Sequence, residues 1–251
     1  MASPIDKRKR GANNLNTRLK YRHELKYYMN QYQYEIVRRQ LRGLLRQDKH
    51  AGATGDYHIR SLYFDDIDNK ALHDKLGGVR DREKYRIRIY NRSDKVIHLE
   101  KKIKRGDYIA KVKEPLTREM YDRILAGDCE ALNVPDKPLL LEMYYEMKNK
   151  LLRPRVIVDY EREAYTAYAG NVRITFDKQL RTGLNQVDIF DPELAMIQAF
   201  DDNLIVFEVK YDEYLPEYVR AAVQTQGLVR QSNSKYVICR KLLKFNSWED
   251  Q

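Results

Sequence analysis

Basic side chains alternate with apolar ones in several short segments of the sequence, and this spacing suits the binding of phosphate. In residues 84–90, Lys84, Arg86 and Arg88 fall on one side of an extended chain, while a tyrosine and two isoleucines between them fall on the other. Arginine matches phosphate oxygens with two parallel donors, and lysine acts as a point charge. The segment therefore predicts a strand with one cationic face that could bind a polyanion.

The same alternation recurs elsewhere in the chain. The charged sides of the other segments carry Arg22, Glu24 and Lys26; His98, Glu100, Lys102 and Lys104; Tyr160 and Arg162; Arg173, Thr175 and Asp177; and Glu208 and Lys210. For any one strand, a solvent-exposed face is the simpler explanation. The recurrence favours a closed sheet whose charged faces point inward, because a ring of eight strands leaves a lumen wide enough for one small ligand.

Three glutamates accompany these cations. Glu24, Glu100 and Glu208 are the oxygen ligands that a hard divalent metal ion needs, and structural salt bridges to neighbouring lysines are the alternative for each. Cations a few ångströms apart repel one another on the order of a few kcal/mol per pair at intermediate dielectric. A bound phosphate chain would relieve that repulsion.

Eight segments have the alternation and the flanking turn residues of strands. They are residues 21–28, 57–65, 83–91, 95–104, 108–114, 154–163, 171–178 and 203–211. Helical periodicity and capping residues predict helices at 31–48, 117–126, 191–200 and 214–225. We therefore expect an α+β fold: an antiparallel eight-stranded β-barrel tunnel with a charged lumen, flanked by helices that cover its apolar outer faces.

The composition limits the partners and the location. The 251 residues include 47 Lys and Arg against 37 Asp and Glu, a net charge of +10 that favours polyanions. No apolar stretch approaches the ~20 residues of a membrane span, and two distant cysteines support neither a disulfide framework nor a zinc site. We expect a cytoplasmic protein with a disordered basic leader at residues 1–20 and a single domain at residues 21–245.

Seven short motifs in a fixed order give the chain a resemblance to a known family. They are Tyr63-Phe64-Asp65, Tyr85-Arg86-Ile87-Arg88, Glu100-Lys101-Lys102, Asp159-Tyr160-Glu161-Arg162, Val172-Arg173-Ile174-Thr175-Phe176-Asp177, Glu208-Val209-Lys210 and Ser234-Lys235-Tyr236. Together they resemble the VTC domain, the polyphosphate-polymerase domain of the vacuolar transporter chaperone complex, a branch of the CYTH-like superfamily of triphosphate tunnel metalloenzymes. The resemblance extends from about residue 21 to residue 243.

The resemblance implies an ATP-dependent polyphosphate polymerase. A divalent metal, Mn²⁺ or Mg²⁺, would assist cleavage of the ATP β–γ bond, and the γ-phosphate would pass to a growing polyphosphate chain. The partners would be ATP and inorganic polyphosphate or triphosphate. The implied phosphate-binding residues are Lys26, Arg86, Arg88, Lys102, Lys113, Tyr160, Arg162, Arg173 and Lys235. The implied catalytic residues are Arg86, Arg88, Lys102 and Glu208, with Glu208 as the metal ligand and Glu24 and Glu100 as further carboxylate candidates.

Two positions depart from the family pattern. Ser232 stands where the tail motif usually carries a second lysine, three residues before Lys235, so one phosphate contact is missing or comes from elsewhere, for example from Arg230. On the first strand, Arg22 replaces the first glutamate of the Glu-x-Glu-x-Lys element of the wider superfamily. That replacement departs from the hydrolase pattern and favours the polymerase branch.

Two other functions stay open. A tripolyphosphatase or nucleoside triphosphatase would use the same tunnel with water as the acceptor, and Glu24 or Glu100 could serve as the base. A non-catalytic polyphosphate- or RNA-binding module would need aromatic stacking surfaces. Tyr27, Tyr63 and Tyr85 alternate out of phase with the cations, which disfavours a nucleic-acid partner. A membrane partner protein and the oligomeric state are left open.

Overall fold

The computed structural model describes residues 19–52, 54–184, 186–200, 204–224, 227–232 and 234–245. Residues 1–18 of the predicted leader lie outside these ranges. Within them, no helix combines the length and the apolar composition that crossing a membrane requires.

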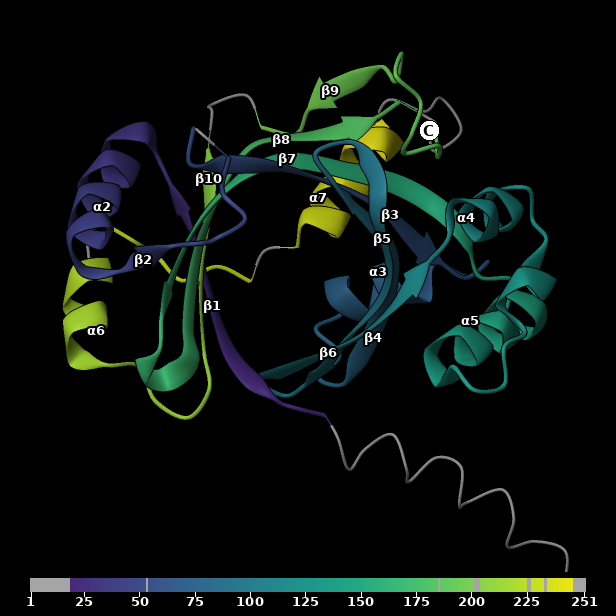
Figure 1. Cartoon of the computed structure of the whole chain (residues 1–251), viewed down its shortest axis with the longest axis horizontal. Coiled ribbons are helices and arrows are strands. Elements are labelled where there is room, and N and C mark those ends of the chain that lie inside the picture. The colour runs from purple at the N-terminus through teal and green to yellow at the C-terminus, as the bar shows by residue number, and fades with distance from the viewer. Residues whose placement is uncertain are drawn as a thin grey trace, which may run out of the picture.

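Eight antiparallel strands form a ring, which Figure 1 views along its opening. In chain order they are β1 (Arg22–Met29), β3 (Asp56–Asp65), β4 (Arg82–Tyr90), β5 (Ser93–Arg105), β6 (Tyr108–Leu116), β7 (Arg153–Ala167), β8 (Val172–Gly183) and β10 (Ile205–Tyr211). Their order around the ring is β7-β3-β4-β5-β6-β1-β10-β8, and β8 pairs with β7 to close it. The structure thus confirms the α+β tunnel fold and all eight predicted strands.

The pairings between neighbouring strands, here called seams, differ in length. β1 pairs with β10 along almost its whole length, from His23 opposite Tyr211 to Met29 opposite Ile205. On its other side, β1 pairs with β6 only where Arg22 and His23 lie opposite Ile109 and Tyr108. Because β6 begins at Tyr108, the rest of β1 extends beyond the β5–β6 turn and has no β6 residue opposite it. In that part of β1, the backbone N–H of Gln231 donates to the carbonyl oxygen of Lys26. The ring is therefore closed at one place by a very short pairing.

Two further strands lengthen the sheet outside the ring. β2 (Arg46–Gln47) pairs with β7, and β9 (Met196–Gln198) pairs with β8. The helix predicted at 191–200 is wrong: the segment holds turns and then β9. The Asp191 carboxylate accepts a hydrogen bond from the backbone of Glu193, as a helix cap would, but the chain continues as a local turn and not as a helix. The free edge of β8 then binds the following residues as a strand.

The helix after β1 begins where the sequence predicts. In α2 (Gln31–Leu44), the Asn30 side chain accepts from the backbone of Gln33, and the Gln33 side chain accepts from the backbone of Asn30. This reciprocal pair satisfies two backbone donors at the start of the helix. The helix ends earlier than the predicted residue 48, because the chain turns there into β2.

Two of the other predicted helices are present and three helices were not predicted. α4 (Arg118–Leu125) begins after its Thr117 cap as expected, and α6 (Glu217–Val223) is shorter than predicted. The unpredicted helices are α3 (Lys70–Leu76), α5 (Pro138–Asn149) and α7 (Lys235–Phe245), and two short 3₁₀ turns, η2 (Cys129–Leu132) and η3 (Ala169–Asn171), complete the elements.

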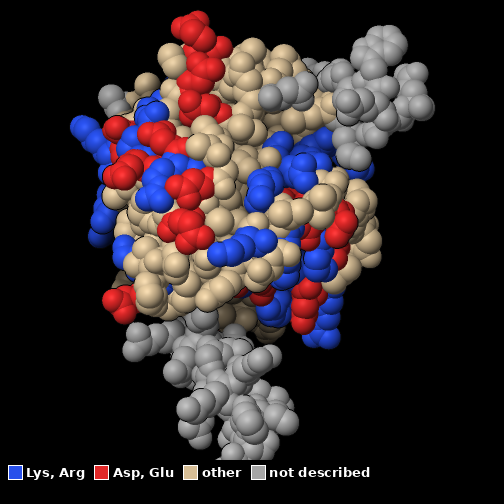
Figure 2. Space-filling model, turned by 90° about the vertical axis from the view of Figure 1, so that its right-hand side faces the viewer, with Lys and Arg blue, Asp and Glu red and all other residues tan. Residues whose placement is uncertain are grey.

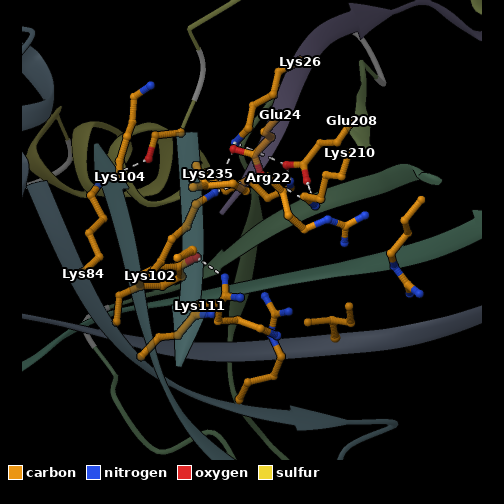
Figure 3. A pocket seen from close by; sticks show the side chains of 18 of the residues that line it. Arg22, Glu24, Lys26, Lys84, Lys102, Lys104, Lys111, Glu208, Lys210 and Lys235 are labelled. Atoms are coloured by element: carbon orange, nitrogen blue, oxygen red, sulfur yellow. Dashed lines mark hydrogen bonds and ion pairs between the residues drawn. The ribbon is translucent and has the colours of Figure 1, made fainter. Parts of the chain in front are cut away.

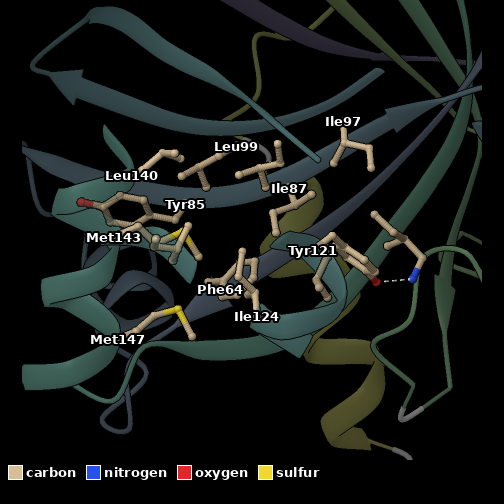
Figure 4. Close-up of a cluster of buried hydrophobic side chains, with 14 of the residues drawn as sticks. Phe64, Tyr85, Ile87, Ile97, Leu99, Tyr121, Ile124, Leu140, Met143 and Met147 are labelled. Carbon is tan, nitrogen blue, oxygen red and sulfur yellow. Dashed lines mark hydrogen bonds between the residues drawn. The ribbon is translucent and has the colours of Figure 1, made fainter. Parts of the chain in front are cut away.

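Two apolar layers cover the outside of the ring, as the alternation predicts. On one side, α4 and α5 pack on the outer faces of β3, β4 and β5, where Phe64, Tyr85, Ile87 and Leu99 are buried (Figure 4). On the opposite side, α2 and α6 pack on the outer faces of β1, β8 and β10. Burying each large apolar side chain contributes about 1.5–3 kcal/mol, so these layers hold the strands whose other faces are charged.

A third apolar cluster lies inside the ring, which the sequence analysis did not predict. α7 places Tyr236, Val237 and Cys239 against the inner faces of β7 and β8 (Figure 1). A β-bulge at Gln179, whose φ is 51°, shifts the alternation of β8 so that Leu180 faces this cluster. One part of the lumen is therefore filled by a helix, and the charged part remains open.

Candidate active site

The lumen contains a cavity of about 950 Å³ with a strongly cationic wall. Among the described residues that line it, sixteen are Lys or Arg and three are Asp or Glu. On the outer face in Figure 2, basic and acidic side chains are interspersed. Much of the excess positive charge of the chain is therefore concentrated in the cavity, where phosphate would neutralise it.

Glu24 on β1 and Glu208 on β10 lie together at the centre of the cavity wall (Figure 3). Lys26 Nζ lies 3.5 Å from Glu24 and 3.4 Å from Glu208. Lys210 Nζ lies 2.5 Å from Glu208 and 3.7 Å from Glu24, and Lys102 Nζ lies 2.8 Å from Glu24. The β1–β10 register causes this arrangement, because Glu24 pairs with Lys210 and Lys26 with Glu208.

The surplus of ammonium groups sets the protonation of this cluster. Burial by itself raises the pKa of Glu24, but Lys102 and Lys26 outweigh it and hold that pKa well below its usual range. Burial lowers the pKa of Lys102 to about 7, since Glu24 is shared with other cations and Lys26 adds repulsion. Both carboxylates are therefore ionised, and the ammonium groups outnumber them.

Lys235, the first residue of α7, extends the cluster. Its Nζ lies 2.9 Å from Glu208 and 2.5 Å from Asp177 on β8. Arg162 on β7 donates to both oxygens of Asp177, at 2.6 and 2.7 Å. Although burial opposes it, the two carboxylates raise the pKa of Lys235 above its ordinary value. The helix that fills part of the lumen thus also delivers a charged lysine to the site.

Arg86 and Arg88 on β4 reach the cavity from the other side. Arg86 Nε donates to Glu100 at 2.8 Å, and Lys111 Nζ donates to the other oxygen of Glu100 at 2.9 Å. Arg88 donates to Tyr160 Oη at 3.1 Å. Glu100 is almost fully buried and does not line the cavity. It forms a cluster separate from Glu24 and Glu208 and holds Arg86 and Lys111 in position.

Of the other implied phosphate-binding residues, two line the cavity and one does not. Tyr160 and Arg173 line the cavity, and Arg173 is fixed by Asp48 at 2.5 Å and by Tyr57 at 2.8 Å. Lys113 is exposed and does not line the cavity, whereas Lys111 on the same strand does. Lys111 lies opposite Lys102 across the β5–β6 hairpin. Aligning the two predicted strands from the turn between them would therefore have identified Lys111 as a cavity residue.

One expectation about the tyrosines is wrong. Tyr63 lines the cavity, and its hydroxyl accepts from Arg86 at 2.8 Å, because the alternation of β3 turns Tyr57, Ser61 and Tyr63 inward. Tyr27 and Tyr85 lie in the outer apolar layers as predicted. The argument against aromatic contacts in the lumen therefore holds for these two tyrosines and fails for Tyr63.

The cavity also contains cations that the implied set omits. Lys75 on α3 donates to the Ser232 hydroxyl, at the position where the family motif usually carries lysine. The further cations are Lys20, Arg22, Arg82, Lys84, Lys104, Lys210 and Arg230. The strand alternation already placed Arg22, Lys84, Lys104 and Lys210 on charged faces, but no sequence signal pointed to Lys75, because it comes from an unpredicted helix.

The carboxylates can be tested for a fit to the implied divalent metal. No group of three or more His, Cys, Asp or Glu side chains suited to a metal occurs in the described part of the chain. Glu24 and Glu208 nevertheless offer ionised oxygens side by side at the cavity wall. Mg²⁺ in phosphate-transferring sites commonly takes one or two carboxylates and completes its shell with substrate phosphates and water. This pair therefore fits such an ion bound together with a phosphate chain.

The ring of strands and its cation-lined lumen define a protein of the tunnel-fold class. A family model, the VTC domain, matches residues 21–244. The chain belongs to the VTC domain family. No curated protein matches it.

Solved structures similar to this chain include a candidate adenylyl cyclase from Hippeastrum that has a dominant triphosphatase activity. It is 12% identical with a TM-score of 0.52, covering 88% of this chain and 95% of its own. A candidate adenylate cyclase from Bacillus halodurans is also 12% identical, with a TM-score of 0.46 over 82% of this chain and 87% of its own. A Pyrococcus horikoshii protein is 13% identical, with a TM-score of 0.44 over 89% and 99% of the two chains. At these identities the likeness to the Hippeastrum protein establishes the fold alone.

Proposed function

We propose that this chain is a metal-dependent polyphosphate polymerase, which transfers the γ-phosphate of ATP to a growing polyphosphate chain inside the tunnel. Membership of the VTC domain family supports a tunnel enzyme that acts on polyphosphate or a related phosphate compound. Sixteen basic and only three acidic side chains line one continuous cavity. This excess of positive charge is the observation that carries the proposal. Such a wall suits a ligand with many negative charges in a row.

The residues of this chain would act mainly by positioning. Arg86, Arg162 and Lys235 are each held by a buried carboxylate, so their donors are fixed before substrate binds. Phosphoryl transfer requires little covalent chemistry from the protein, and its rate comes from alignment and charge neutralisation. Preorganised cations along the tunnel would align the ATP phosphates with the end of the acceptor chain.

A divalent metal, when bound, would neutralise charge on the phosphate oxygens. In the proposed site Glu24 and Glu208 would hold it, and Lys26 and Lys210, which now contact both carboxylates, would turn to the phosphates. Mn²⁺ and Mg²⁺ are both suited to these oxygen ligands.

A triphosphatase is the second candidate, because the structurally similar Hippeastrum protein has a dominant triphosphatase activity. In that case water would accept the phosphoryl group. Arg22 argues against it, because Arg22 occupies the position of a glutamate in the hydrolases and forms a 2.8 Å ion pair with Asp212 instead of offering a carboxylate.

Product analysis separates the two candidates. The purified chain is incubated with ATP and Mn²⁺, and ADP, free phosphate and long-chain polyphosphate are measured separately. ADP with polyphosphate and little free phosphate is expected. Free phosphate without polymer would replace the proposal by the triphosphatase, and tight polyphosphate binding without ATP turnover would leave a binding module.

One expectation remains a prediction. The unpaired cysteines Cys129 and Cys239 favour a reducing compartment, and hence the cytoplasm.

A further inference from the structure

Four cations at one end of the cavity differ from the cations at its centre. Lys75, Arg82, Lys84 and Lys104, here called the cationic rim, come from α3, β4 and β5. Arg82 lies opposite Lys104 and Lys84 opposite Lys102 across the β4–β5 pairing. The rim therefore begins beside Lys102 and continues two residues further along β5, a step of about 7 Å.

The rim cations lack ion pairs of the kind that hold the central cations. Lys75 donates to Ser232 Oγ, Lys84 donates to Ser234 Oγ at 3.3 Å, and Arg82 donates to a backbone carbonyl oxygen. Over the described ranges no ion pair within 4.0 Å joins any of the four to a carboxylate. The central cations, in contrast, share Glu24, Glu208, Glu100 and Asp177.

The positive charge around the rim lysines lowers their pKa values. Burial and the repulsion of Lys102 and Arg82 lower the pKa of Lys84 to about 7, and burial with Arg82 lowers that of Lys75 to about 8. Figure 3 shows Lys84 and Lys104 at the left of the cavity and Glu208 at the right. Asp107 attracts Lys104 and Asp74 attracts Arg82 without forming an ion pair, and an anionic ligand would relieve the repulsion that remains among these half-buried cations.

We propose that the cationic rim is a second, metal-independent subsite, which binds the phosphates of an inorganic polyphosphate chain that extends beyond the central carboxylates. The inference rests on the proposed function and adds a length requirement to it. A divalent ion belongs where the carboxylates are, so phosphates at the rim contact only ammonium, guanidinium and hydroxyl donors. A triphosphate is accommodated by the central cations, and only a longer chain reaches the rim.

The test compares two ligands in the absence of divalent metal. Binding of tripolyphosphate and of long-chain polyphosphate is measured by calorimetry in EDTA for the complete chain and for the double variant Lys84→Ala/Lys104→Ala. We expect long-chain binding to weaken at least about tenfold, the loss of one or two charged hydrogen bonds, and tripolyphosphate binding to change less than about twofold. The slope of long-chain affinity against salt concentration should also fall.

Matched variants control for charge and for folding. Lys49→Ala/Lys95→Ala removes two exposed lysines outside the cavity wall and should leave both affinities unchanged. Lys84→Arg/Lys104→Arg retains the charges and should restore most of the long-chain affinity. Thermal melts of each variant establish that the ring is intact.

Three results would overturn the subsite. These are an equal loss for both ligands, no loss for either, or a single-stranded RNA that binds with the same dependence on Lys84 and Lys104. The experiment needs no ATP turnover, so its failure is distinguishable from that of the proposed function. If the natural chain makes no polymer but the double variant loses affinity for long-chain polyphosphate alone, the rim subsite is supported and the polymerase assignment is rejected.

Discussion

Glu208 contacts three lysines at the centre of the cavity. Its two oxygens bind Lys26, Lys210 and Lys235, which come from β1, β10 and α7. Although burial opposes ionisation, Lys210 and Lys235 hold the pKa of Glu208 far below its usual range. The carboxylate is therefore charged at any physiological pH and can both orient lysines and attract a metal ion.

Replacing this carboxylate by an amide tests that role. Glu208→Gln should lower ATP turnover at least about 100-fold, comparable to the removal of one preorganised electrostatic group, and should raise the Mn²⁺ concentration needed for half-maximal rate. Turnover is measured across a Mn²⁺ titration. Glu119→Gln, an exposed glutamate on α4, makes the same chemical change away from the cavity and should behave as the natural chain. Unchanged turnover and metal requirement in Glu208→Gln would contradict the assignment.

The stability of the chain should depend on pH through Lys84. Burial and neighbouring cations lower its pKa from 10.5 to about 7 in the folded state. Between these values the unfolded chain binds more protons than the folded chain, so stability rises with pH over this window. Lys84→Met should stabilise the ligand-free protein by about 2 kcal/mol at pH ~7 after allowance for solvent screening.

Thermal melts between pH ~7 and ~9 check this prediction. The advantage of Lys84→Met over the natural chain should shrink as pH rises, because the natural lysine loses its proton. Lys95→Met replaces an exposed lysine and should show no such trend. A Lys84→Met protein that is less stable at pH ~7, or whose advantage is independent of pH, would show that Lys84 is not strained by its neighbours.

Among single residues, the sequence predicts those that follow from strand alternation. Arg86, Arg88, Lys102, Arg162 and Glu208 stand on segments whose period of two determines their direction. The partners of these cations could not be predicted in the same way. Whether Glu100 meets Arg86 or Glu24 depends on which strands are neighbours in the ring, and that is a property of the whole sheet.

At the scale of elements, the N-terminus of α2 offers a quantitative test. Asn30→Ala removes the side-chain half of the reciprocal cap and should lower the free energy of unfolding by about 1 kcal/mol. Denaturation by urea measures the change, and Asn30→Asp, which keeps an acceptor oxygen, should lose little. Because α2 covers the outer faces of β8 and β10, ATP turnover should be unchanged. Equal losses for both variants would mean that packing, and not the cap, is responsible.

Elements with local signals were predictable and those determined by tertiary contacts were not. α2 and α4 have caps and a regular apolar period, and both begin where predicted. β9 and α7 carry no comparable signal in the sequence. β9 is a strand because the edge of β8 is free, and α7 is placed by the apolar patch inside the ring. Tertiary context decides such segments.

At the scale of the molecule, the short β1–β6 seam should be the most labile part of the ring. Backbone amides that donate across the β1–β6 pairing should exchange with solvent at least about 100-fold faster than those of the long β3–β7 pairing. Hydrogen exchange followed by NMR or mass spectrometry measures this. The β1–β10 side of the same strand provides the internal control. Equal protection on both sides of β1 would show that the ring opens elsewhere.

The position of β1 in the ring also affects the order of events during synthesis. β1 is the first strand of the domain, yet its long partner β10 is made about 175 residues later. At ~5–20 residues per second, the nascent chain waits roughly 10–40 s before that partner leaves the ribosome. Over this time β1 is an unpaired edge, and the charges of Arg22, Glu24 and Lys26 keep it from joining other chains. The side chains that later line the tunnel would thus also disfavour the pairing of the new strand with other chains.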